Sequence, residues 1–128
     1  MSTLKTSNIQ DTSGSNNSTP EEISQGRAKA WINFDGTASS IGTGRNNYNV
    51  SSVTDNGGGN YTITLTNGTA NTNSAVFVSG TRSALPNSNY SRMSHVEQKT
   101  TTTIRVHTWD SASTKEDHIT ICVAVFGD

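Results

Sequence analysis

The chain has 128 residues and a formal net charge of −1, and Ser, Thr, Asn and Gly together supply nearly half of it. This length allows one domain with a modest core. The charge is nearly balanced and no basic stripe is visible, which argues against nucleic-acid binding, because that depends on neutralising phosphates. No apolar run approaches the about 20 residues of a membrane-spanning helix, so membrane insertion is not expected.

The hydrophobic fraction of 30% is low. A single copy of such a chain has a thin core, so we expect contacts between copies to supply part of its stability. We therefore predict a homotrimer.

The first segment, residues 1–18, is polar and carries Leu4 and Ile9. It cannot bury enough apolar surface to order itself alone. We predict an extended N-terminal arm that lies along other subunits, with Leu4 and Ile9 as its assembly contacts. The arm has no hydrophobic stretch of the signal-peptide type, so we expect synthesis in a cytoplasm.

A short helical elbow is predicted over residues 19–26. Thr19 can cap the helix, Pro20 suits its first position, and Glu22 completes a capping box. Gly26 ends it after one or two turns.

The remainder, residues 27–128, is predicted to be all-β: an antiparallel, jelly-roll-like β-sandwich, with a barrel-like variant left open. Short runs rich in Thr, Val and Ile alternate with turns rich in Gly and Asn. Tyr61, Ile63 and Leu65 alternate strictly with threonines, which is the clearest strand pattern in the chain. The predicted strands are 27–34, 48–53, 61–66, 75–79, 90–99, 100–109 and 118–126.

Two strands, Ala75–Ser79 and Ile121–Phe126, are apolar on both faces. A strand of this kind is typical of a central position, packed between two layers or two subunits. Cys122 lies in the second of them, and we expect it in the core. As the only cysteine it excludes an internal disulfide.

Residues for catalysis or metal binding do not form a recognisable pattern. His95, His107 and His118 lack the spacing of a zinc site within one chain, and a site made from one histidine of each subunit on a threefold axis is left open. The carboxylates fall mostly in predicted turns, where solvated turn residues are the ordinary interpretation. We therefore assign no catalytic, cofactor-binding or metal residue and expect no enzyme.

The loops at 35–47, 81–89 and 110–117 are predicted to form an outward face. Aromatic and arginine side chains on loops are typical of sites that bind sugars or proteins. The candidates for this partner-facing surface are Arg45, Arg82, Tyr90, Arg92 and Trp109.

Three stretches of sequence carry a resemblance to a known group of proteins. They are LKTSNIQDTSGSNNSTPEEISQGRAKAWINFDGTASSI, YNVSSVTDNGGGNYTITLTNG and the terminal ITICVAVFGD. This order resembles a domain of tail fibres and other surface-exposed virion proteins of tailed bacteriophages, especially those of cyanobacteria. The resemblance covers about Leu4 to Tyr61 and returns at Ile119 to Asp128, leaving residues 67–117 unmatched.

The resemblance implies a structural virion protein, attached to capsid or tail proteins through its arm, as a head decoration, head fibre or tail-attached fibre component. The alternative is a receptor-binding adhesin with a lectin-like tip for host surface polysaccharide. A depolymerase is the third hypothesis, and two carboxylates in one groove would favour it.

Overall fold

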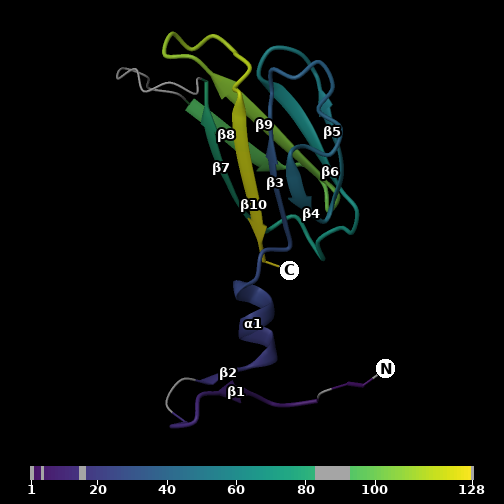
Figure 1. The fold of residues 1–128 in the computed structure, drawn as a ribbon, viewed down its shortest axis with the longest axis vertical. Coiled ribbons are helices and arrows are strands. Elements are labelled where there is room, and N and C mark those ends of the chain that lie inside the picture. Colours follow the sequence, from purple (N-terminus) through teal and green to yellow (C-terminus); the bar gives the residue numbers. More distant parts are fainter. Residues whose placement is uncertain (1, 4, 15–16, 83–92, 128) are drawn as a thin grey trace.

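The computed structural model describes residues 2–3, 5–14, 17–82 and 93–127. It consists of an N-terminal arm, one short helix and two four-stranded antiparallel sheets (Figure 1). The prediction of an all-β antiparallel sandwich is confirmed.

Each sheet joins strands that are far apart in the sequence. The strands of the first sheet, in spatial order, are β4 (Asn46–Tyr48), β3 (Ala30–Phe34), β10 (Thr120–Phe126) and β7 (Ala75–Thr81). Those of the second are β5 (Val50–Asp55), β6 (Asn60–Leu65), β9 (Thr103–Trp109) and β8 (Met93–Gln98). The first and last strands of the sandwich, β3 and β10, are antiparallel neighbours in the same sheet.

The core lies between the two sheets and is filled by alternate residues of each strand. The alternation predicted for β6 is confirmed, and β3 and β9 alternate in the same way, since the inward residues of all three strands are buried. Phe34 and Tyr61 meet edge to face across the layers, with ring centroids 5.2 Å apart. The buried apolar set is Ala30, Ile32, Phe34, Val50, Val53, Tyr61, Ile63, Leu65, Ile104, Val106, Ile121, Val123 and Val125.

The strand predicted at 48–53 is broken at Asn49, where the chain leaves the first sheet and enters the second. Asn49 has a φ of 58°, a left-handed conformation that asparagine tolerates better than most residues. Its side-chain amide donates to the carbonyls of Lys29 and Asn67, each at 2.9 Å, and its Oδ1 accepts from the Asn67 amide at 2.8 Å. Asn49 thus fixes the corner of the sandwich.

Other strand ends agree with the prediction or differ from it by up to three residues. Residues 100–102 turn between β8 and β9, because the Thr100 hydroxyl accepts from the backbone amides of Thr102 and Thr103. The part of the predicted strand 90–99 before Met93 lies outside the described residues.

The helical elbow is confirmed as α1 (Pro20–Gly26). The Thr19 hydroxyl accepts from the Glu22 amide at 3.1 Å, and the Glu22 carboxylate accepts from the Thr19 amide at 2.7 Å. Both bonds of the capping box are therefore present. Within the described ranges, no helix is long and apolar enough to cross a membrane.

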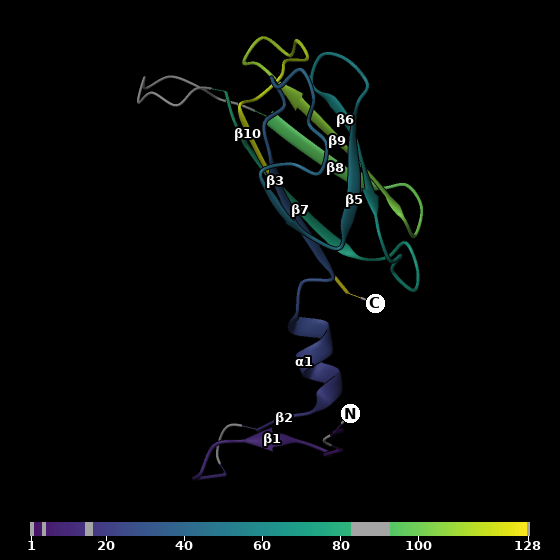
Figure 2. The same cartoon turned by 45° about the vertical axis from the view of Figure 1, so that its right-hand side comes forward.

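The arm was predicted to be extended throughout. It instead folds back as a small hairpin of β1 (Ile9–Gln10) and β2 (Asn17–Ser18). The arm and α1 project from one end of the sandwich (Figures 1 and 2). Ile9 is 54% exposed and Ile23 is 41% exposed. Leu4, the other predicted assembly contact, lies outside the described residues.

The expectation that Cys122 lies in the core is wrong. Strand β10 is central in its sheet, as predicted, but only one of its faces is packed in this chain. Ile121, Val123 and Val125 point inward, so the alternation places Cys122 on the exposed outer face.

Candidate functional site

Among the described residues, three loops meet at the end of the sandwich opposite the arm. They connect β3 to β4, β5 to β6, and β9 to β10 (Figures 1 and 2). Two of them contain predicted partner-facing segments. This loop end is the first candidate site, because it combines exposed position with a concentration of charged side chains.

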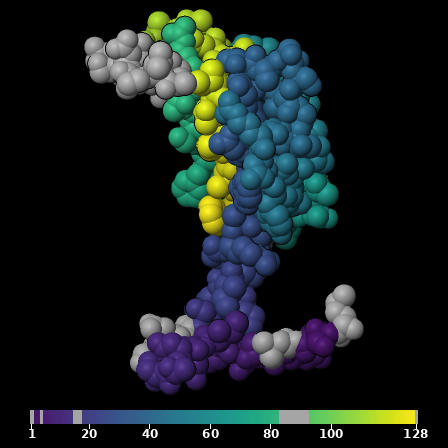
Figure 3. Space-filling view, in the orientation of Figure 1, coloured from purple at the N-terminus to yellow at the C-terminus, as the bar shows by residue number. Residues whose placement is uncertain are grey.

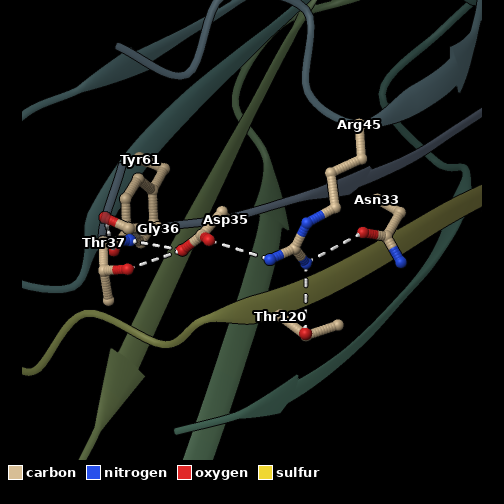
Figure 4. Close-up of polar contacts among 7 residues, drawn as sticks. All are labelled: Asn33, Asp35, Gly36, Thr37, Arg45, Tyr61 and Thr120. Atoms are coloured by element: carbon tan, nitrogen blue, oxygen red, sulfur yellow. Dashed lines mark hydrogen bonds and ion pairs between the residues drawn. The ribbon is translucent and has the colours of Figure 1, made fainter. Parts of the chain in front are cut away.

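An ion pair between Arg45 and Asp35 spans the β3–β4 loop, with Nη2 2.8 Å from Oδ2 (Figure 4). The other carboxylate oxygen of Asp35 accepts from the Thr37 hydroxyl at 2.7 Å and from the Thr37 amide at 3.0 Å. These bonds, first of all the one from the Thr37 hydroxyl, hold the pKa of the Asp35 carboxyl below its usual value.

The Arg45 guanidinium also binds two strands of the first sheet. Its Nη1 donates to Thr120 Oγ1 at 3.1 Å and to Asn33 Oδ1 at 3.4 Å (Figure 4). The Arg45 side chain therefore fixes the loop against β10 and β3. Its exposed fraction of 46% leaves it accessible to a partner as well.

A second network lies beneath the loops. The Tyr61 hydroxyl donates to Asp117 Oδ1 at 2.6 Å, and the same oxygen accepts from the Gly59 amide at 2.6 Å. Burial raises the pKa of Tyr61, and the hydrogen bond to Asp117 and the charge of that carboxylate raise it further. Gly59 has a φ of 62°, and a Cβ there would collide with the backbone of Thr108 and Glu116. The β5–β6 and β9–β10 loops are thus tightly joined.

The remaining predicted residues at this end are placed as follows. Arg82 forms an ion pair with Glu116 of the β9–β10 loop. Trp109 ends β9, where its ring packs on His107 with centroids 5.6 Å apart. Tyr90 and Arg92 lie outside the described residues.

Arg45 and Arg82 lie at the same end of the first sheet. Arg45 donates to Thr120, which pairs in register with Thr81, the residue before Arg82. Trp109 belongs to the other sheet.

Asp35, Glu116 and Asp117 already have partners within the chain. In the part of the chain that the structure describes, no group of three His, Cys, Asp or Glu side chains is close enough to hold a metal ion.

The second candidate is a groove of about 380 Å³ on the outer face of the first sheet. Trp31, Phe77 and Ala124 line it together with Cys122. The sequence indicated this groove only through the apolar character of β7 and β10 on both faces. That pattern did not show which aromatic residues lie on the outer face of the sheet. The structure separates Phe34 and Tyr61, which are core, from Trp31 and Phe77, which are exposed.

A smaller hollow of about 260 Å³ lies at the arm end of the sandwich. Its lining includes Arg27, Lys29, Tyr48 and Asn67. It adjoins the Asn49 corner, so its walls belong to the structural network that joins the sheets.

Comparisons with protein-family models, with curated proteins and with solved structures found no match to this chain.

Proposed function

We propose that the chain is a structural protein of a bacteriophage particle, a homotrimer attached through its N-terminal arm and displaying its β-sandwich on the particle surface. The arm joins a capsid or tail protein, and the loop end faces outward. The resemblance to virion proteins motivates the class of protein. The division of the molecule into an arm, a helix and a sandwich supports the manner of attachment.

The observation that carries the proposal is the placement of exposed apolar side chains on the segments that project from the sandwich. Ile9 and Ile23 are more than one-third exposed although each is a large apolar residue. The short hairpin β1–β2 cannot be stable on its own, since isolated two-stranded hairpins are marginal in water. A partner surface that covers these residues would supply the missing burial.

The proposal is tested by comparing the full chain with a form lacking residues 1–18 in a phage that carries the gene. Both forms should be folded, because the core residues all lie beyond the arm. We expect the full chain in purified particles and the shortened form in the unassembled fraction. Equal incorporation of the two forms would contradict attachment through the arm.

A second candidate function is that of an adhesin for host surface polysaccharide. The observation that favours it is a row of three rings on the second sheet: the half-buried Trp109 contacts His107 at a tilt, and His107 stacks at 6.4 Å on the exposed His95 of β8. Aromatic rings with polar groups beside them are suited to a sugar face. Trp109→Ala should leave folding and particle assembly nearly intact. Reduced adsorption to the host would then favour an adhesin, and unchanged adsorption would favour pure decoration.

A further inference from the structure

The outer face of the first sheet carries an apolar row that crosses all four strands. Tyr48 pairs in register with Trp31, Trp31 with Ala124, and Ala124 with Phe77. All four side chains point away from the core. Phe77 is 62% exposed and Trp31 38%, so the row is open to its surroundings.

The row combines large and small side chains, so its surface is uneven and could interlock with another surface. Ala124, the smallest member, lies between Trp31 and Phe77. The groove of about 380 Å³ lies over this part of β10, with β3 on one side and β7 on the other. The ring of Phe126 meets Phe77 edge to face at 6.1 Å, which extends the apolar surface along β10 and β7. Figure 3 shows β10 in yellow, uncovered between β7 in green and the blue residues on its other side.

The two sheets differ sharply in the charge of their strands. Within β4, β3, β10 and β7 no residue carries a formal charge. The second sheet holds Asp55, Glu97, Arg105 and two histidines. A sheet with one solvated face normally alternates apolar and polar residues. The second sheet follows that rule. The first departs from it in the half nearest the arm, where Tyr48, Trp31, Ala124 and Phe77 all face outward.

We propose that the outer face of the first sheet, formed by β4, β3, β10 and β7, packs against the same face of further copies of this chain. The inference rests on the proposed function in one respect, the expectation that copies associate. It adds the surface through which they do so. Phe77 at one side of the face is the projecting group, and the groove beside Trp31 of the next copy is its seat.

Charge supports a second copy as the occupant. A face without formal charges can meet itself without repulsion, whereas a charged partner would find no opposite charge on these strands. Arg45 borders the face where it binds Asn33 and Thr120, but its charge is balanced by Asp35 of its own chain. The result is an apolar centre with a polar rim, the usual anatomy of a protein interface.

The test compares two substitutions on opposite faces of the full chain. Phe77→Asp places a charge on the proposed interface, and Thr54→Asp places the same charge on β5, the exposed edge strand of the other sheet. Light scattering should give wild type and Thr54→Asp the same mass, three times the 13.6 kDa of one chain. Phe77→Asp should give the mass of one chain, with an unchanged circular dichroism spectrum.

A second readout locates the contact without depending on the stability of the variant. Cys122 is the only cysteine and lies in the groove. Its thiol should react with a maleimide more slowly in the wild-type assembly than in Phe77→Asp. A monomeric wild-type chain, or a Phe77→Asp variant that keeps the wild-type mass and thiol protection, would overturn the proposal.

The outcomes also separate this inference from the proposed function. A chain that is absent from particles yet dissociates on Phe77→Asp would contradict the function and support the interface. A chain that enters particles but keeps its mass in Phe77→Asp would contradict the interface alone. A dimer that dissociates on Phe77→Asp would support the interface and contradict the homotrimer.

Discussion

Tyr61 and Asp117, 56 residues apart, are joined by a hydrogen bond of 2.6 Å between the tyrosine hydroxyl and a carboxylate oxygen. The bond connects the core strand β6 to the loop before β10. Because the same oxygen also accepts from the Gly59 amide, one carboxylate holds two loops of the sandwich together.

The first prediction concerns this hydrogen bond. Tyr61→Phe keeps the ring against Phe34 but removes the donor, and it should lower the free energy of unfolding by about 1–2 kcal/mol. Urea denaturation measures the loss. Tyr48→Phe is the matched control, because Tyr48 is half exposed, and it should change stability by less than about 0.5 kcal/mol. Equal effects of the two substitutions would contradict the role assigned to Asp117.

The second prediction concerns alkaline pH. The raised pKa of Tyr61 means that the folded chain keeps this proton where the unfolded chain, with a pKa of about 10, loses it. The contribution of Tyr61 to stability is therefore complete below about pH 10 and declines as the pH rises above it. Unfolding free energies measured across this range should fall more steeply for wild type than for Tyr61→Phe. Parallel curves would count against a buried, protonated Tyr61.

The third prediction concerns the corner at Asn49. Asn49→Ala loses four side-chain hydrogen bonds and places alanine at a positive φ, whereas Asn49→Gly loses the bonds without the backbone strain. Both should be destabilised, and alanine should be worse than glycine by about 1 kcal/mol. Thermal unfolding of the two variants gives the comparison. If alanine proved as stable as glycine, the left-handed conformation would not be maintained in solution.

The fourth prediction concerns the helix between the arm and the sandwich. Thr19→Ala removes the capping box and should destabilise α1 by about 1 kcal/mol. Amide exchange in residues 21–24 should become faster, while exchange in β6 and β9 stays unchanged. Thr12→Ala, in the arm, is the control. Faster exchange throughout the sandwich would show that the helix and the sheets unfold together.

Local patterns in the sequence predicted much of the fold. The alternation around Tyr61, Ile63 and Leu65 identified β6 and its buried face, and the capping box identified α1 because all of its partners lie within four residues. These features depend on side chains close together in the sequence, so they can be predicted without knowing the tertiary structure.

Features that depend on distant partners were missed or were placed wrongly. The break at Asn49 depends on carbonyls at residues 29 and 67, and the exposure of Cys122 depends on which face of β10 meets the second sheet. The outward row of aromatic residues follows from the register of four strands. Arg45 and Arg82 were predicted only as members of exposed loops, and the pairing of Arg45 with Asp35 and of Arg82 with Glu116 could not be predicted without the fold.

The central claim, that the chain is displayed on a virus particle, is tested most directly by labelling intact particles. Particles from a phage carrying the gene are purified by density, probed with an antibody against the sandwich, and imaged by electron microscopy. The account predicts that the chain sediments with intact particles and that the antibody decorates their surface. A chain found only in the unassembled fraction, with complete particles that the antibody does not bind, would contradict it.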